Sequence, residues 1–151
     1  MARGPQRPKR ILVVEDDAWI RTFIRDVLTD EGYDVVEAAD GRTSLRLAAA
    51  RPPDLVLLDL AMPELTGVDV LHELKRARGT QPVPVLVLSA YTRVLPACDA
   101  NSVAAVLSKP LDVERLLESV REAIAASGAE SMSNAHAGQL GTPVCDQEGQ
   151  S

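Results

Sequence analysis

Acidic, hydroxyl and basic side chains follow four short apolar runs of this chain, each close to the point where the run ends. The run 55–58 ends at Asp59, and the run 11–14 ends at three consecutive acids. Two further runs are followed by a hydroxyl group, Ser89, and by an ammonium group, Lys109. Such runs are typical of buried strands in a parallel sheet, where binding sites lie beyond the carboxyl ends of the strands. We therefore expect these side chains to meet in one site.

This combination of groups favours the transfer of a phosphoryl group. For Asp59 alone, a helix or loop cap would be the simpler interpretation. Clustered carboxylates, however, repel one another and raise one another's pKa unless a cation joins them. Oxygen ligands favour Mg²⁺ over Zn²⁺, and no set of His and Cys residues competes with them. A metal ion and Lys109 could neutralise phosphoryl oxygens while Asp59 attacks in line, which would give an acyl phosphate.

Five apolar runs alternate with helical patterns along the middle of the chain. Strands are expected at 11–14, 35–36, 55–58, 83–88 and 103–107. The first helix carries apolar residues at helical spacing, namely Ile20, Phe23, Ile24, Val27 and Leu28. Strict alternation with short links predicts a doubly wound α/β fold, in which helices cover both faces of a five-stranded parallel sheet. The segment 91–102 fits least well, because Pro96 stands where a helix would run.

The composition limits the possible partners. The chain has 151 residues, of which 46% are hydrophobic and 25% charged, as in an ordinary globular protein. Its net charge of -6 argues against nucleic acid as a partner, because a phosphate backbone requires a basic surface. No apolar run approaches the ~20 residues of a membrane span, and residues 1–10 lack the apolar core of an export signal. We expect a cytoplasmic protein without a membrane or nucleic-acid partner.

The two ends of the chain differ from the middle. Residues 1–9 are rich in Arg, Lys, Gly and Pro, which predicts a flexible basic arm. Residues 127–151 contain Gly, Ser, Asn and Gln but no Lys or Arg, which predicts a disordered tail. The folded domain is therefore expected to span 10–126. The tail is too short for an output domain, so a stand-alone protein is expected.

Four motifs, in order and correctly spaced, resemble the receiver domain of two-component response regulators. They are 11–17, 58–63 with Gly67, 88–90 and 108–110. The resemblance covers 10–126 and implies a flavodoxin-like sheet of strand order 2-1-3-4-5. It also implies that Asp59 receives a phosphoryl group from a histidine kinase or a histidine phosphotransfer protein. The phosphorylated chain would then dock to a downstream protein target.

The resemblance assigns a role to each residue of the metal site. By position, Asp16 would bind Mg²⁺ directly and Glu15 would bind it through water. Ala61 would contribute its backbone carbonyl, and Asp59 itself would be the third protein ligand. Asp17 is expected to cap the following helix rather than to bind the metal.

The resemblance also assigns the groups that handle the phosphoryl group. Ser89 would be the switch hydroxyl that holds a phosphoryl oxygen, and Lys109 would pair with the phosphoryl group. In the family the peptide bond that corresponds to Lys109–Pro110 is cis, which would direct the ammonium group into the pocket.

Three features depart from the family's pattern. Val106 stands three residues before the lysine, where the family usually has a Tyr or Phe, so a readout through a swinging ring is in question. Pro96 is expected to alter the fourth helix and its output face. Tyr91 lies two residues after the switch hydroxyl, and we expect it to roof the pocket and to slow the attack of water on the acyl phosphate.

Other functions of this architecture fit the sequence less well. A phosphatase with an Asp nucleophile would need a second Asp where Ala61 stands. A flavin module would need a phosphate-binding loop where the first strand ends in acids, and a cobalamin module would need a His near Asp59. A degenerate receiver that acts only as a phosphorylation-independent scaffold stays open as the alternative. We expect a phosphoacceptor signalling domain rather than an enzyme, with chemistry limited to its own phosphorylation and dephosphorylation.

Overall fold

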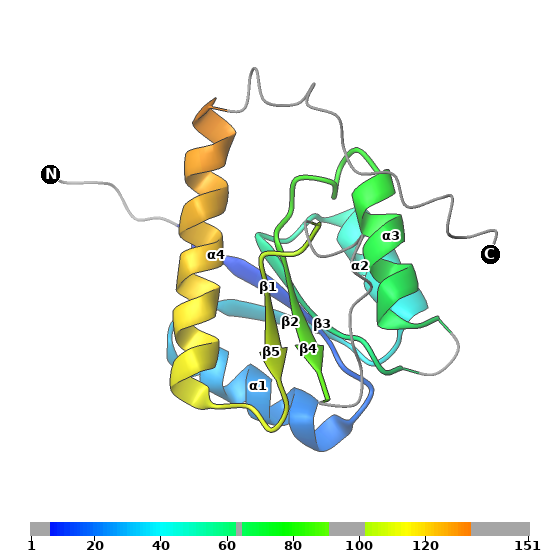
Figure 1. Ribbon diagram of the computed structural model, residues 1–151, viewed down its shortest axis with the longest axis vertical. Helices are drawn as coiled ribbons and strands as arrows, with labels where there is room; N and C mark the ends of the chain where they lie inside the picture. Colours follow the sequence, from blue (N-terminus) through cyan, green and yellow to red (C-terminus); the bar gives the residue numbers. More distant parts are fainter. Residues whose placement is uncertain (1–6, 63–64, 91–101, 134–151) are drawn as a thin grey trace, which may run out of the picture.

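The computed structural model describes residues 7–62, 65–90 and 102–133 of the chain. Five strands form one sheet in the order β2-β1-β3-β4-β5, and all neighbouring strands are parallel (Figure 1). The strands are β1 (Arg10–Val14), β2 (Asp34–Ala38), β3 (Leu55–Asp59), β4 (Val85–Ser89) and β5 (Ala105–Ser108). The predicted doubly wound fold and its strand order are confirmed.

Helices cover both faces of the sheet. Within the described residues they are α1 (Ala18–Asp30), α2 (Gly41–Ala50), α3 (Gly67–Arg76) and α4 (Val113–Ser133). Helices α1 and α4 lie on one face, and α2 and α3 lie on the other (Figure 1). None of them is long and apolar enough to cross a membrane.

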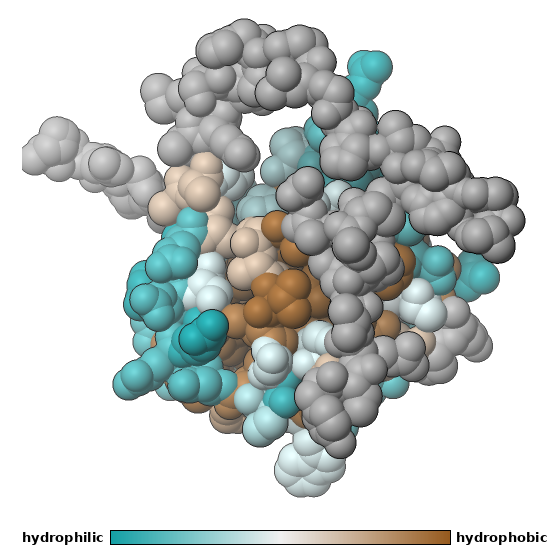
Figure 2. All heavy atoms as spheres, viewed as in Figure 1, coloured by the Kyte–Doolittle hydropathy of each residue, from teal (hydrophilic) through white to brown (hydrophobic). Residues whose placement is uncertain are grey.

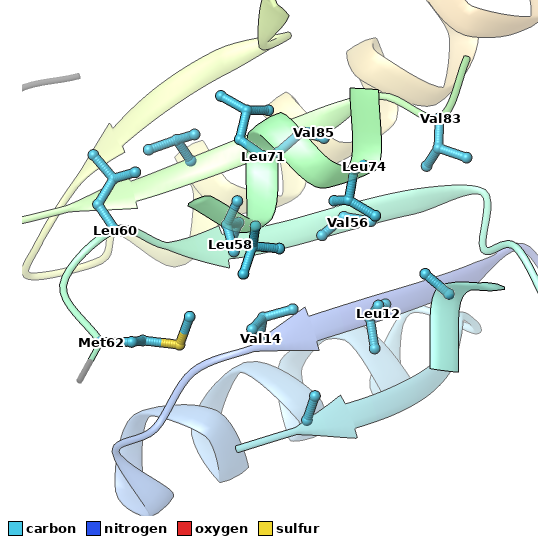
Figure 3. Close-up of a cluster of buried hydrophobic side chains, with 14 residues drawn as sticks. Leu12, Val14, Val56, Leu58, Leu60, Met62, Leu71, Leu74, Val83 and Val85 are labelled. Carbon is cyan, nitrogen blue, oxygen red and sulfur yellow. The ribbon is translucent and has the colours of Figure 1, made fainter. Parts of the chain in front are cut away.

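Successive residues of the three central strands face opposite helical layers, because side chains alternate along a strand. The layer of α2 and α3 packs on Leu12, Val14, Val56, Leu58, Val85 and Val87 (Figure 3). The layer of α1 and α4 packs on Ile11, Val13, Leu55, Leu57, Leu86 and Leu88. All these side chains are buried, and each contributes about 1.5–3 kcal/mol of hydrophobic stabilisation. The central strands are thus held from both sides, and their ends form a rigid base for a site.

The first helix begins and ends as its sequence predicts. Asp17 Oδ1 accepts hydrogen bonds from the N–H groups of Trp19 (2.9 Å) and Ile20 (3.3 Å), so Asp17 is the N-cap of α1. Beyond the end of the helix, Gly32 adopts a φ of 96°, a left-handed conformation that glycine tolerates best.

Helix α3 ends earlier than expected. In the sequence, Gly79 is the first glycine after the apolar pattern and is the residue expected to end this helix, but the helix ends at Arg76. The hydroxyl group of Thr80 donates a hydrogen bond of 2.7 Å to the carbonyl of Leu74. This bond satisfies a carbonyl that the helix leaves without an intrahelical partner, so the chain can turn away before Gly79.

The later segments of the chain also differ in their boundaries. Strand β4 begins at Val85 rather than at residue 83, after Pro84, which has no N–H group to donate to a neighbouring strand. Helix α4 continues past residue 126 to Ser133, into the segment expected to be a disordered tail. Residues 127–133 include three Ser and one Gly, which are weaker helix formers, so the composition of the extension does not predict its helical structure. The expectations for Pro96 and for 134–151 fall outside the described residues.

Figure 2 shows the molecule as spheres in the orientation of Figure 1. Polar and charged residues line the outer side of α4, and apolar residues gather over the middle of this face, where β4 and β5 lie. Among the exposed large apolar side chains is that of Val106 on β5, which is 46% exposed.

Candidate functional site

The register of the sheet brings the predicted side chains to one edge. Val14 pairs with Leu58, so Glu15 and Asp59, the next residue of each segment, lie at the same level. On the other side of β3, Asp59 itself pairs with Leu88 of β4. The carboxyl ends of parallel strands share one edge of the sheet, so Glu15 and Asp59 are neighbours although they are far apart in the chain.

Strand β5 completes this edge. Ser89 of β4 pairs with Ser108 of β5, and the N–H group of Lys109 donates a hydrogen bond of 2.9 Å to the carbonyl of Ser89. The peptide bond between Lys109 and Pro110 is cis, as predicted. The hydrogen bond between Lys109 and Ser89 places the lysine at the level where β4 ends.

Three carboxylates converge at this edge. Glu15, Asp16 and Asp59 each offer one oxygen atom, and these atoms lie within 4.8 Å of one another. Glu15 and Asp59 are buried, whereas Asp16 is exposed. Among the described residues, the buried Oε1 of Glu15 has no hydrogen-bond partner. A buried carboxylate oxygen without such a partner, beside two other carboxylates, fits a divalent cation with oxygen ligands such as Mg²⁺.

The ammonium group of Lys109 lies between the two buried carboxylates. Its Nζ is 3.2 Å from Asp59 Oδ1 and 3.1 Å from Glu15 Oε1. The contact with Asp59 is also a hydrogen bond, whereas the contact with Glu15 is an ion pair without hydrogen-bond geometry. Asp59 Oδ1 accepts a second hydrogen bond, of 3.2 Å, from the N–H group of Ala61. The Asp59 carboxylate is therefore held in one orientation by a charge and a backbone amide.

Burial and mutual repulsion set the pKa values at this edge. Burial, and then the nearby Asp59, raise the pKa of Glu15 from 4.5 to about 7, although the Asp17 N–H group and Lys109 oppose the shift. For Lys109, burial alone would lower the pKa of the ammonium group. Glu15 and Asp59 together outweigh this effect and raise its pKa above the ordinary value. Lys109 thus stays charged, and in the absence of a cation Glu15 loses its proton at a higher pH than an ordinary glutamate does.

The remaining predicted residues lie around this cluster. Ser89 is buried at the end of β4, and its Oγ donates a hydrogen bond of 2.9 Å to the Ala90 carbonyl. Ala61 follows β3, and its N–H group donates a hydrogen bond to Asp59 Oδ1, whereas the role of its carbonyl as a metal ligand stays a prediction. Val106 lies outside the cluster, on β5. Tyr91 falls outside the described residues.

Gly67 positions α3 against the backbone of β3. Its N–H group donates a hydrogen bond of 3.1 Å to the carbonyl of Leu60. A Cβ atom at Gly67 would overlap the carbonyl oxygen of Asp59 and lie 2.5 Å from the Leu60 Cα. Only glycine permits this approach, which explains its place in the 58–67 motif.

Sequence reasoning did not single out Arg21, which contacts the acidic turn. Its Nη1 donates a hydrogen bond of 2.8 Å to the backbone carbonyl of Glu15. The available signal was its position four residues after the N-cap Asp17, which places both residues on one face of α1.

A parallel α/β sheet of this strand order, with three carboxylates and a lysine at its carboxyl edge, is the arrangement that the sequence motifs predict for a receiver domain. The chain belongs to the response regulator receiver domain family, whose model matches residues 11–121. It is therefore a signalling domain of the two-component type rather than a conventional enzyme, and the resemblance found in its motifs is confirmed.

Individual relatives agree with this assignment. The chain is 36% identical over 121 residues to the transcriptional regulatory protein PdtaR of Mycobacterium tuberculosis, a match that covers 78% of this chain and 57% of PdtaR. It is 30% identical over 121 residues to the polar-differentiation response regulator DivK of Brucella anthropi, covering 76% of this chain and 94% of DivK. The chain thus spans little more than half of PdtaR but nearly all of DivK.

Solved structures show the same fold. The chemotaxis protein CheY4 of Vibrio cholerae superposes with a TM-score of 0.70 at 28% identity, covering 77% of this chain and 98% of that protein. A sensor protein from Polaromonas sp. JS666 superposes with a TM-score of 0.74 at 30% identity, covering 81% and 99%.

Proposed function

We propose that this chain accepts a phosphoryl group on Asp59, in a Mg²⁺-dependent reaction, from a phosphohistidine of a histidine kinase or a histidine phosphotransfer protein. The observation that carries the proposal is the position of Lys109 Nζ, 3.2 Å from Asp59 Oδ1 and beside the cluster of three carboxylates. A structural ion pair would need only one of these acids. A lysine with three converging carboxylates matches the requirements of a phosphoryl group and a cation.

Each residue has a part in the proposed reaction. Asp16, Glu15, Asp59 and the Ala61 carbonyl would hold Mg²⁺, which neutralises negative charge on the phosphoryl oxygens when it is bound. An Asp59 carboxylate oxygen forms a bond to phosphorus as the phosphorus–nitrogen bond of the donor breaks. The departing imidazole keeps the bonding electron pair. Lys109 already lies against Asp59 and would pair with the transferred group.

Ser89 is the proposed switch hydroxyl. Its Oγ donates a hydrogen bond of 2.9 Å to the carbonyl of Ala90, and rotation of the Ser89 side chain would direct the hydroxyl toward a phosphoryl oxygen. Such a rotation would couple phosphorylation to the segment that follows β4, and we propose that this controls docking of a downstream protein. A phosphohistidine donor of this kind implies that the chain acts in the cytoplasm.

Tyr91 and Val106 are the two predicted modulators of the site. We retain the proposal that Tyr91 slows attack of water on the acyl phosphate, and an unchanged dephosphorylation rate in Tyr91→Ala would contradict it. Val106 has no ring to move in or out of the core and is 46% exposed. We therefore propose that docking depends on Ser89 and Lys109 rather than on an aromatic switch.

The test is incubation with Mg²⁺ and a small acyl-phosphate donor, followed by intact-mass measurement. The parent should gain one phosphoryl group, and Asp59→Asn should gain none. Asp17→Asn is the matched control, because it changes a neighbouring acid that caps α1 and Asn also caps helices well. Removal of Mg²⁺ by a chelator should prevent labelling. A parent that is never labelled would instead favour the second candidate, a phosphorylation-independent scaffold, for which the exposed Val106 is the supporting observation.

A further inference from the structure

Glu15, the first residue of the acidic turn 15–17, takes part in three hydrogen bonds among the described residues. The N–H group of Glu15 donates to the Ala38 carbonyl at 3.1 Å, which ties the turn to the end of β2. The N–H group of Asp17 donates to Glu15 Oε2 at 3.2 Å, within the turn. Arg21 Nη1 donates to the Glu15 carbonyl at 2.8 Å. The third bond is the only one of these made by a side-chain donor.

The guanidinium group of Arg21 is itself held in place. Its Nε donates a hydrogen bond of 3.2 Å to Glu37 Oε1 on β2, and its side chain is 19% exposed. The other oxygen of Glu37 accepts a hydrogen bond of 3.3 Å from Arg25, one turn further along α1. Arg25 differs in its remaining contacts, which go to its neighbour Asp26 and not to the acidic turn. Of the two arginines that bind Glu37, only Arg21 also contacts the acidic turn.

We propose that Arg21 is a positioning residue for the metal site, and that Glu37 orients it. The inference rests on the proposed function. The carbonyl of Glu15 and the N–H group of Asp16 belong to one planar peptide group, so a fixed carbonyl fixes the direction in which Asp16 leaves the turn. Asp16 is exposed and has to converge with two buried carboxylates. The planar fork of an arginine can hold the Glu15 carbonyl and Glu37 at once.

Charge and positioning make opposite predictions for the loss of Arg21. A guanidinium group near the acids repels a cation, so its removal would tighten Mg²⁺ binding if charge alone mattered. The same electrostatic effect would be expected for Arg25. If Arg21 positions the turn, its removal weakens Mg²⁺ binding although a positive charge has been lost. The direction of the change therefore distinguishes the two explanations.

The chain carries its own probe for this test. Trp19 is its single tryptophan; its backbone N–H group donates a hydrogen bond of 2.9 Å to Asp17 Oδ1, and the residue is 87% exposed, two positions after the acidic turn. Mg²⁺ titrations followed by Trp19 fluorescence, with the Mg²⁺ dependence of the melting temperature as a second measurement, give the dissociation constant. The variants are Arg21→Gln, Arg21→Lys and the matched control Arg25→Gln.

We expect Arg21→Gln to bind Mg²⁺ about tenfold more weakly than the parent, as is usual for partners that orient metal ligands. Arg25→Gln should stay within about twofold, and Arg21→Lys should lie between the two. Equal or tighter binding by Arg21→Gln, or an equal loss in both Gln variants, would overturn the proposal. If Arg21→Gln fails to fold, Glu37→Gln replaces it, with a smaller loss expected and an unchanged affinity overturning the inference.

Phosphoryl acceptance by the same variants separates this inference from the proposed function. Arg21→Gln should need more Mg²⁺ but reach the labelling of the parent at saturation, whereas Asp59→Asn should remain unlabelled. Mg²⁺ binding that depends on Arg21, without labelling of the parent, would contradict the proposed function only. If the parent and Arg21→Gln were labelled at the same Mg²⁺ concentration, the result would contradict the role of Arg21 only.

Discussion

Gly67 begins helix α3 directly against the carbonyl oxygen of Asp59, and no side-chain atom fits between them. The backbone of the proposed phosphoacceptor is therefore fixed by its close contact with the first residue of a helix. This contact links packing to chemistry, because any residue that pushes α3 outward also shifts the loop that follows Asp59.

Gly67→Ala should therefore destabilise the domain by about 2 kcal/mol, the usual cost of an added carbon in a packed site. It should also slow labelling by an acyl-phosphate donor. Urea unfolding and intact mass measure the two effects. Gly79→Ala is the matched control, since a Cβ there meets nothing within 4 Å and its stability should be unchanged. Equal stabilities for the two variants would show that α3 can move away from the added Cβ atom without loss of stability.

The stability of the Mg²⁺-free protein should depend on the protonation of Glu15. Its pKa is raised from 4.5 to about 7, so the folded state binds this proton more tightly than the unfolded state does. The resulting stabilisation is complete below about pH 4.5 and is lost as the pH rises through 7. Urea unfolding between about pH 4.5 and pH 7 should show that the free energy of unfolding falls as the pH rises. The Glu15→Gln variant should show a smaller fall. Mg²⁺ binding should strengthen over the same range, because the cation competes with the proton. A Glu15→Gln variant with the pH profile of the parent would contradict this assignment.

Lys109→Met should leave two buried carboxylates without their cation. Loss of one partner of a buried pair costs about 3 kcal/mol, and the Lys109 side chain is 20% exposed, so the lower part of the usual range applies. Unfolding in urea at pH 8 without Mg²⁺ is the measurement. Lys9→Met, at an exposed position, should have little effect. A small loss at Lys109 would mean that water already screens the two acids.

Mg²⁺ should stabilise the folded chain, by about 2.7 kcal/mol at a hundredfold excess over its dissociation constant. Asp16→Asn should lose most of this gain, because it removes the exposed carboxylate of the cluster. Asp17→Asn should keep most of it. The measurement is the melting temperature with Mg²⁺ and with a chelator. If Asp17→Asn loses the gain and Asp16→Asn keeps it, the two acids have been assigned the wrong way round.

The site residues that could be predicted from the sequence are those that stand directly at the ends of buried strands. Buried apolar runs define β1, β3 and β4, and parallel pairing then places Glu15 and Asp59 at one level. The contact from Arg21 to the Glu15 carbonyl could not be predicted, because an arginine on a helix can reach several partners and only the packing angle selects one. The end of α3 was missed because the hydroxyl of Thr80, rather than a glycine, satisfies a helix carbonyl.

The bridging position of Lys109 has a consequence for biosynthesis. Because an internal ammonium group balances the acids, the newly made polypeptide can reach its native state without waiting for a metal ion. Under the proposed function, arrival of the ion would then be a later event in the life of a finished molecule, and we expect the cellular supply of divalent ions to act on signalling rather than on folding.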